Sequence, residues 1–229
     1  MVALWCKVSG MFTRSEAEEN LRTIRSLMER STIYRAISAP TALVGGVLSV
    51  VACATYHYVS TDVVSVFLGF WLGTLVLTAA ANTWFIWKGA KARSEPFISS
   101  GMKLAIISLL PSMLCAGFFT FYVLITDSMS AYILPTFWMI CYGLGLLSTS
   151  HFAPRSITLL GWVFLFSGFA VFLFQATHSA SFEATIDTFS KVYSNSNLLM
   201  GATFGVYHLI YAACTWPRKT TGTTPGVEP

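Results

Sequence analysis

The sequence predicts an all-α polytopic membrane protein: six transmembrane helices form three antiparallel hairpins, preceded by a cytoplasmic amphipathic helix. Of its 229 residues, 55% are hydrophobic and only 10% are charged, whereas a soluble domain usually carries about a quarter charged residues. A helix needs roughly 20 mostly apolar residues to cross a bilayer. The stretches that meet this length lie at about 37–59, 63–87, 102–126, 131–149, 156–177 and 197–216.

The distribution of positive charge predicts the orientation of these spans. All but one of the 14 lysines and arginines flank the apolar stretches on one side, and the exception is Lys191. Cytoplasmic loops accumulate Lys and Arg, so a multi-pass protein of the inner or plasma membrane is expected, with both its N-terminus and its C-terminus cytoplasmic. The net charge of +4 does not indicate nucleic-acid binding, because the basic residues lie where anionic lipid headgroups attract them.

Three regions follow from this pattern. Residues 1–35 form a cytoplasmic N-terminal segment, and the export-type cleavage site of a signal peptide is not recognisable in it. Residues 36–216 form the six-helix transmembrane domain. Residues 217–229 are rich in Thr, Gly and Pro and are predicted to be a disordered tail.

An amphipathic helix is predicted over about 15–35. Ser15 and Glu18 have the spacing of a capping box, which satisfies the first free backbone amides of a helix. Apolar residues then recur at near-helical intervals, and basic residues point elsewhere. Two interpretations remain open: an interfacial helix that orients the first span, or a docking surface for a cytoplasmic partner. The candidate docking residues are Leu21, Ile24, Met28, Arg22 and Arg25.

The first two hairpins carry recognisable interface and packing features. Trp84 and Trp87 beside Lys88 are typical of aromatic anchors at the cytoplasmic interface. Gly69 and Gly73 form a GxxxG pair, which favours close contact between helices. In the third and fourth spans, Pro111 is expected to kink its helix, whereas Pro135 falls in a first turn, where proline is tolerated.

His208 is the most notable side chain of the spans. At 100° per residue it shares a helix face with Gly201, Gly205 and Ala212, a stripe of small residues that allows a neighbouring helix to approach closely. A neutral histidine that bonds a group on the neighbouring helix is one interpretation. The other is a proton-relay or ligand-contacting role, because ionisable groups inside membranes are costly.

Asn82 is the second candidate for such a role. It lies about five residues before Trp87, on the face of Thr78 and opposite Gly69 and Gly73. It is interpreted as an interhelical hydrogen-bonding group or as a residue that lines a small polar cavity.

Three short segments resemble a family of small, uncharacterised multispan bacterial inner-membrane proteins. They are Leu21–Ser31 ahead of the first span, Tyr142–Gly145 and Phe204–Tyr211, within a similarity that runs from Glu18 to Trp216. The resemblance implies the fold and a bacterial inner-membrane location. It implies no catalytic residues.

The residues favour a non-enzymatic membrane protein. A convergent nucleophile, base and charge-stabilising group is not recognisable, so no catalytic residue, metal or cofactor is predicted. The first hypothesis is an accessory or regulatory factor that acts with a cytoplasmic or membrane protein partner. The alternatives are a small-solute transporter or channel, with His208, Asn82 and Pro111 around its path, and a membrane-embedded enzyme acting on lipid. The glycine stripes leave a homo-oligomer open.

Overall fold

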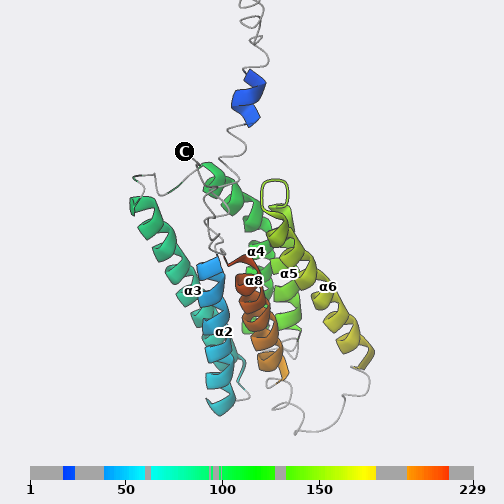
Figure 1. Cartoon of the computed structure of the whole chain (residues 1–229). Helices are drawn as coiled ribbons and strands as arrows, with labels where there is room; N and C mark the ends of the chain where they lie inside the picture. Colours follow the sequence, from blue (N-terminus) through cyan, green and yellow to red (C-terminus); the bar gives the residue numbers. More distant parts are fainter. Residues whose placement is uncertain are drawn as a thin grey trace, which may run out of the picture.

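Every regular element in the described part of the chain is helical (Figure 1). The computed structural model describes residues 18–23, 39–59, 63–92, 94, 98, 100–126, 133–178 and 195–216. The helices of the bundle are α2 (Ala39–Val59), α3 (Val64–Ala92), α4 (Ser100–Thr126), α5 (Leu134–Ser148), α6 (Arg155–His178) and a last helix over Asn195–Thr215, in which η3 (Gly201–Tyr207) precedes α8 (His208–Thr215). The predicted all-α class is confirmed.

Five of these helices are long and apolar enough to cross a membrane, namely α2, α3, α4, α6 and the last helix. The chain is therefore an integral, multi-pass membrane protein. The predicted span 131–149 is represented by the 15-residue α5, which is about 22 Å long against a hydrocarbon core of roughly 30 Å. Pro135 lies in its first turn as predicted, and the helix ends at Ser148, ahead of a turn that leads to Pro154.

The last helix does not pair mainly with its predecessor. α2 packs against α3, and α5 packs against both α4 and α6, so consecutive helices are neighbours in these cases. The last helix packs chiefly against α2 and has only minor contact with α6, and α8 lies between α2 and α5 in Figure 1. The first two predicted hairpins are thus packed pairs, whereas the third brings the end of the chain back to its first span.

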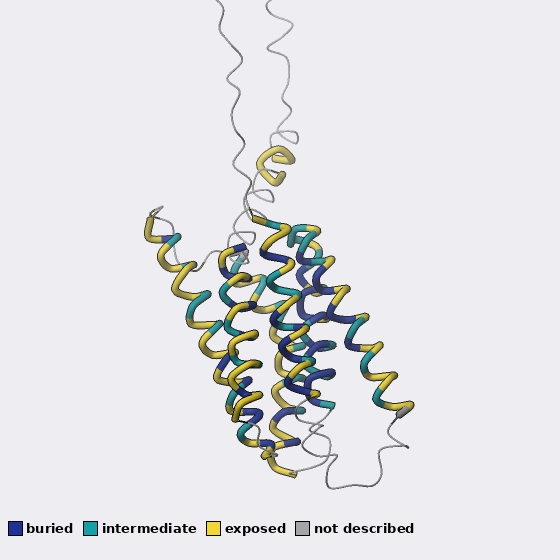
Figure 2. The backbone as a smooth tube through the Cα atoms, turned by 60° about the horizontal axis from the view of Figure 1, so that its bottom comes forward, coloured by how far each residue is buried: buried dark blue, intermediate teal, exposed yellow. Residues whose placement is uncertain are grey.

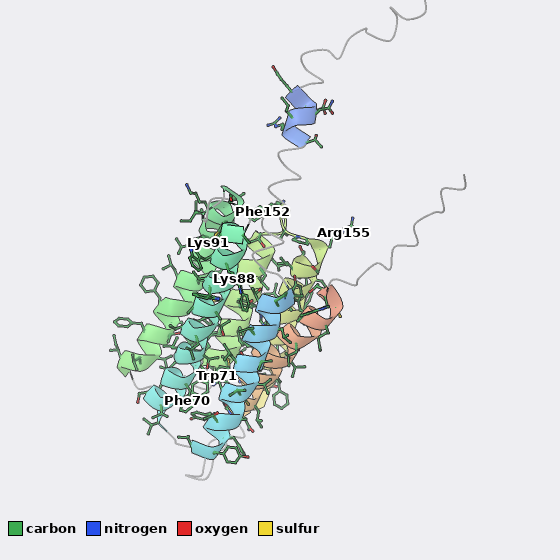
Figure 3. All side chains as sticks on the ribbon, turned by 60° about the vertical axis from the view of Figure 1, so that its left-hand side comes forward. Phe70, Trp71, Lys88, Lys91, Phe152 and Arg155 are labelled. Carbon is green, nitrogen blue, oxygen red and sulfur yellow. The ribbon has the colours of Figure 1, made fainter. Side chains whose placement is uncertain are left out.

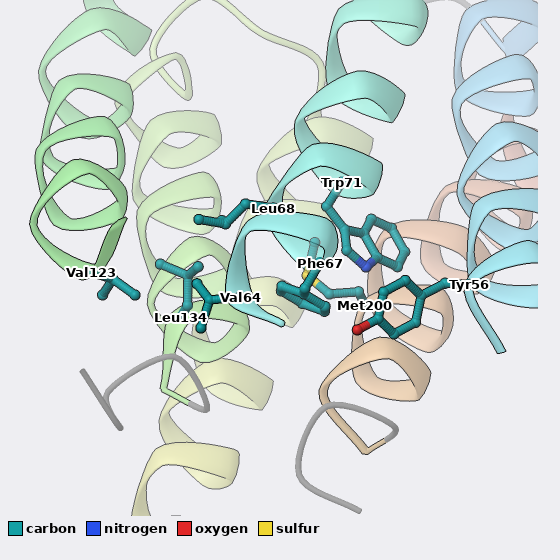
Figure 4. Packing of buried hydrophobic residues seen from close by; sticks show 8 residues of the cluster. All are labelled: Tyr56, Val64, Phe67, Leu68, Trp71, Val123, Leu134 and Met200. Atoms are coloured by element: carbon teal, nitrogen blue, oxygen red, sulfur yellow. The ribbon is translucent and has the colours of Figure 1, made fainter. Parts of the chain in front are cut away.

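Two apolar clusters hold the bundle together, and exposed residues occur along its long helices (Figure 2). The first cluster joins α2, α3, α4, α5 and the last helix (Figure 4), through Tyr56, Val64, Phe67, Leu68, Trp71, Val123, Leu134 and Met200. The second joins α2, α5, α6 and α8, through Ala42, Met139, Leu146, Ile157, Leu160, Phe164, Tyr211 and Ala212. The outward apolar side chains are those expected of helices in contact with lipid.

Glycines set the closest helix contacts. A Cβ on Gly143 of α5 would lie 2.8 Å from the backbone nitrogen of Leu165 and 2.9 Å from the carbonyl oxygen of Gly161, both on α6. A Cβ on Gly205 would lie 2.8 Å from Cγ2 of Val50 on α2. At Gly143 the close atoms belong to the backbone, so only a residue without a side chain allows the observed separation, whereas at Gly205 the side chain of Val50 would have to shift.

The GxxxG pair of α3 behaves differently. Gly69 and Gly73 are exposed, and a Cβ on either would meet nothing within 4 Å among the described residues. The predicted close contact at this pair is therefore wrong within the described part of the chain, because α2 packs against the opposite face of α3, which carries Trp71 and Thr78.

α4 is the most exposed of the long helices. It continues through Pro111, which is exposed. Its polar contacts with α5 are a hydrogen bond from Trp138 Nε1 to Thr120 Oγ1 (2.8 Å) and one from Ser148 Oγ to the carbonyl oxygen of Ser108 (2.8 Å).

Replacing Gly143 with alanine is expected to lower the free energy of unfolding in detergent micelles by about 1–3 kcal/mol. The added methyl group would overlap backbone atoms of α6, which have no room to move. Titration with sodium dodecyl sulfate, followed by circular dichroism, measures this change.

Gly73→Ala is the matched control, because the same methyl group enters open space there. Its free energy of unfolding should stay unchanged or rise slightly through the better helix propensity of alanine. Equal losses for the two variants would contradict a specific α5–α6 contact at Gly143.

Candidate functional site

A hydrogen-bonded pair, His208 and Tyr142, lies between the last helix and α5. The Nε2 atom of His208 is 2.9 Å from the hydroxyl oxygen of Tyr142, and Nδ1 is 2.9 Å from the carbonyl oxygen of Phe204. A carbonyl only accepts, so Nδ1 carries the hydrogen and Nε2 accepts the hydrogen bond of the phenol. Both nitrogens of the neutral ring therefore have a partner.

The local helix geometry prepares this arrangement. Residues Gly201–Tyr207 form a π-helical segment that ends directly at His208. The backbone N–H of His208 bonds to the carbonyl oxygen of Gly205, and the carbonyl oxygen of Phe204 receives the imidazole N–H. π-Helical turns are rare in proteins, and those that occur often lie at functional sites. Here the turn supplies the acceptor that fixes the tautomer of the histidine.

Aromatic rings surround the pair. The centroid of the imidazole lies 5.6 Å from those of Tyr142 and Phe164 and 6.4 Å from that of Phe204, with which it stacks at 15°. Tyr142 meets Phe164 edge to face at 4.9 Å. These rings come from α5, α6 and the last helix. The hydrogen bond of the pair therefore joins α5 to the last helix, and Phe164 adds apolar ring contacts from α6.

The glycines and the imidazole contact different neighbours. Cβ atoms on Gly201 and Gly205 would meet Cys53 and Val50 of α2, whereas the imidazole of His208 bonds to α5. The single face predicted at 100° per residue is divided because Gly201 and Gly205 lie within the wider π segment and His208 directly follows it, which changes the angle between them. Ala212, one turn after His208, is buried in the second apolar cluster.

Asn82 lies on α3, away from this pair. Thr78, which was predicted to share a face with Asn82, packs against α2: its Cγ2 atom would lie 3.1 Å from a Cβ added to Gly45. The Oδ1 atom of Asn82 is buried, and no donor among the described residues reaches it. The hydrogen bond predicted for Asn82 is therefore not formed by this oxygen within the described part of the bundle.

A second polar contact joins α2 to the last helix and was not anticipated from the sequence. Asn197 is fully buried, and its Nδ2 donates to the carbonyl oxygen of Cys53 (2.9 Å), while the thiol of Cys53 points to the carbonyl oxygen of Asn197 (3.4 Å). An asparagine within an apolar stretch is the signal that identifies such a contact, and it is the signal that drew attention to Asn82.

The remaining candidates do not converge on this site. Pro111 is exposed on α4, so His208, Asn82 and Pro111 lie on three separate helices. Within the described ranges, no three His, Cys, Asp or Glu side chains gather as metal ligands would. Residues 18–23 are helical, with Leu21 and Arg22 exposed, whereas Ile24, Arg25 and Met28 lie outside the described residues.

Comparison with known proteins adds no assignment. Neither the protein-family models nor the curated proteins nor the solved structures include a match to this chain.

Tyr142→Phe is expected to lower the free energy of unfolding by about 0.6–1.7 kcal/mol, the range measured for hydrogen bonds between membrane helices. The ring contacts remain, and only the donor to Nε2 of His208 is lost. Unfolding in mixed micelles measures the difference.

Tyr122→Phe serves as the control, because Tyr122 is 56% exposed on α4 and should tolerate the change. In a His208→Phe background the Tyr142→Phe change should cost less, since the acceptor has gone. An undiminished cost in that background would contradict the hydrogen bond as the source of stability.

Proposed function

We propose that the protein spans a bacterial inner membrane six times with both chain ends on the cytoplasmic side. The support comes from charge and geometry together. Lys88 and Lys91 at the end of α3 lie at the same end of the bundle as Arg155 at the start of α6 (Figure 3). Cytoplasmic ends of spans accumulate such residues.

The short α5 counts as the sixth span in this proposal. It packs between α4 and α6, and Thr149, the first residue after its end, is only 1% exposed. Backbone that is not helical is tolerated at membrane depth where protein covers it. A helix of 15 residues is therefore sufficient for an interior span, although it would be too short for one surrounded by lipid.

The proposed role is that of a non-enzymatic accessory or regulatory membrane factor. One observation carries this proposal: His208, an ionisable residue in the bundle interior, has both imidazole nitrogens bonded inside an aromatic enclosure. A catalytic histidine exchanges a proton with its substrate through a ring nitrogen, and here Tyr142 and Phe204 occupy both nitrogens. His208 is therefore interpreted as a neutral histidine that stabilises the contact between two helices.

The partner-binding surface of this factor is proposed to be the N-terminal amphipathic helix. Its described residues 18–23 are all exposed, including the apolar Leu21. An exposed leucine beside arginines suits either a membrane surface or the groove of a partner protein. The proposal commits to a protein partner at the cytoplasmic face.

Cysteine labelling in intact cells tests the six-span topology. Single cysteines at Lys91 and Lys219, in a background without the native cysteines, should react with an impermeant maleimide only after the cells are opened. A cysteine at Lys191 should react in intact cells, because the proposal places this residue outside.

If α5 did not cross the membrane, the number of spans after Lys91 would be odd. Lys91→Cys and Lys219→Cys would then be labelled on opposite faces. That pattern would overturn the six-span proposal and leave the five long helices unaffected.

The triple variant Leu21→Ser, Ile24→Ser and Met28→Ser tests the docking surface. Chemical cross-linking in cells, followed by mass spectrometry of the purified chain, should show at least a tenfold loss of the major cross-linked protein. The apolar face that would contact the partner is removed, whereas the spans are intact.

Thr23→Ser is the control for this experiment, since it keeps a small hydroxyl at an exposed helical position. Membrane insertion of both variants is checked by carbonate extraction. Recovery of the same cross-linked protein from the triple variant would contradict the docking role.

A further inference from the structure

The last turns of α3 carry two tryptophans and two lysines on one face. In the set Trp84, Trp87, Lys88 and Lys91, each residue is three or four positions from two of the others, the spacing at which helix side chains are neighbours. The rings of Trp84 and Trp87 lie 5.4 Å apart, and Nζ of Lys91 is 5.3 Å from the centroid of Trp87. We call these four residues the α3 ridge.

The length of α3 places the α3 ridge at the membrane surface. α3 has 29 residues from Val64 to Ala92, and about 20 residues suffice to cross the hydrocarbon core. Counted from Val64, the core therefore ends near Thr83, one residue before Trp84. The α3 ridge then lies at the depth of the lipid headgroups.

The α3 ridge is also open to its surroundings. Trp84 and Trp87 are 59% and 43% exposed, and both lysines are exposed. α3 packs mainly against α2, and the end of α3 stands apart from the other helices in Figure 1. A molecule that occupies the headgroup layer can reach the α3 ridge from the side.

The charge of the α3 ridge defines the ligand. α3 contains no Asp or Glu, and no carboxylate among the described residues forms a salt bridge with Lys88 or Lys91. The contact with Trp87 positions the ammonium group of Lys91 but does not neutralise it. A phosphate group would bind the two adjacent positive charges, and an apolar chain attached to it would pack against the two exposed indole rings.

We propose that the α3 ridge is a binding site for an anionic phospholipid. The headgroup phosphate binds at Lys88 and Lys91, and the upper part of the acyl chains packs against Trp84 and Trp87. This inference goes beyond the accessory role proposed above. It requires only that α3 crosses the membrane, and it holds on either face.

Native mass spectrometry of the full chain, purified in a neutral detergent, tests the site. The protein is titrated with dioleoylphosphatidylglycerol or with dioleoylphosphatidylcholine, which differ in headgroup charge and share their acyl chains. The wild type should retain the anionic lipid in preference to the zwitterionic one, and the preference should fall as ionic strength rises.

Lys88→Gln with Lys91→Gln should weaken binding of the anionic lipid by about twenty- to thirtyfold, or about fivefold for each lysine. Lys88→Arg with Lys91→Arg keeps the charge and should retain binding. Lys191→Gln, which removes a positive charge from the connection between α6 and the last helix, is the matched control and should bind like the wild type.

Two results would overturn the proposal. The first is a wild type that shows no preference for the anionic lipid, a measurement that does not depend on the folding of any variant. The second is a preference that Lys88→Gln with Lys91→Gln leaves as strong as in Lys191→Gln, since the anionic lipid would then bind elsewhere.

Discussion

Close approach of helix backbones is the constraint on which this bundle depends. In a bilayer, burial of an apolar side chain between helices yields little, because the lipid tails it leaves are equally apolar. Association must come from tight packing and from polar contacts. Both crossings that organise the structure, α5 with α6 and α2 with the last helix, occur where glycines allow contact at backbone distance.

Each of three polar contacts connects a different pair of helices. Asn197 bonds to the backbone of α2, Tyr142 bonds to His208 of the last helix, and Trp138 bonds to Thr120 of α4. A polar group inside a bilayer is costly without a partner, so each contact favours one arrangement of helices over others. The last helix takes part in two of these contacts. It therefore links α2, which packs against α3, to α5, which packs against α4 and α6.

The positions of the helices could be predicted from the sequence better than which helices pack against one another. Helix positions could be read directly, because length and apolar composition are local properties. The contact of Gly201 and Gly205 with another helix was also foreseen, but α2 as that helix was not. Gly69 and Gly73 show the reason: a lipid-facing stripe and an interhelical stripe have the same composition, since the two environments are equally apolar.

The candidate site was predictable only as far as His208 itself. Its partner Tyr142 lies 66 residues away in the chain, and pairing across helices depends on their relative rotation. That rotation is altered by the π segment, which the 100° periodicity does not describe. The length of α5 was overestimated for a related reason: three of the four residues by which 131–149 exceeds the helix are Ala131, Tyr132 and Ile133, which are as apolar in composition as the helix they precede.

The π segment combines two sets of contacts in one helix. Gly201 and Gly205 lie within this segment and face α2, whereas His208, which follows it directly, bonds through its imidazole to α5. A regular α-helix advances about 100° per residue, so deletion of one residue between Gly205 and His208 would rotate the imidazole by about that angle relative to the glycines. The shortened helix would then keep its glycines against α2 or its bond to Tyr142, but not both. The wider turn therefore allows one helix to contact two neighbours with residues that a regular helix would place on a single face.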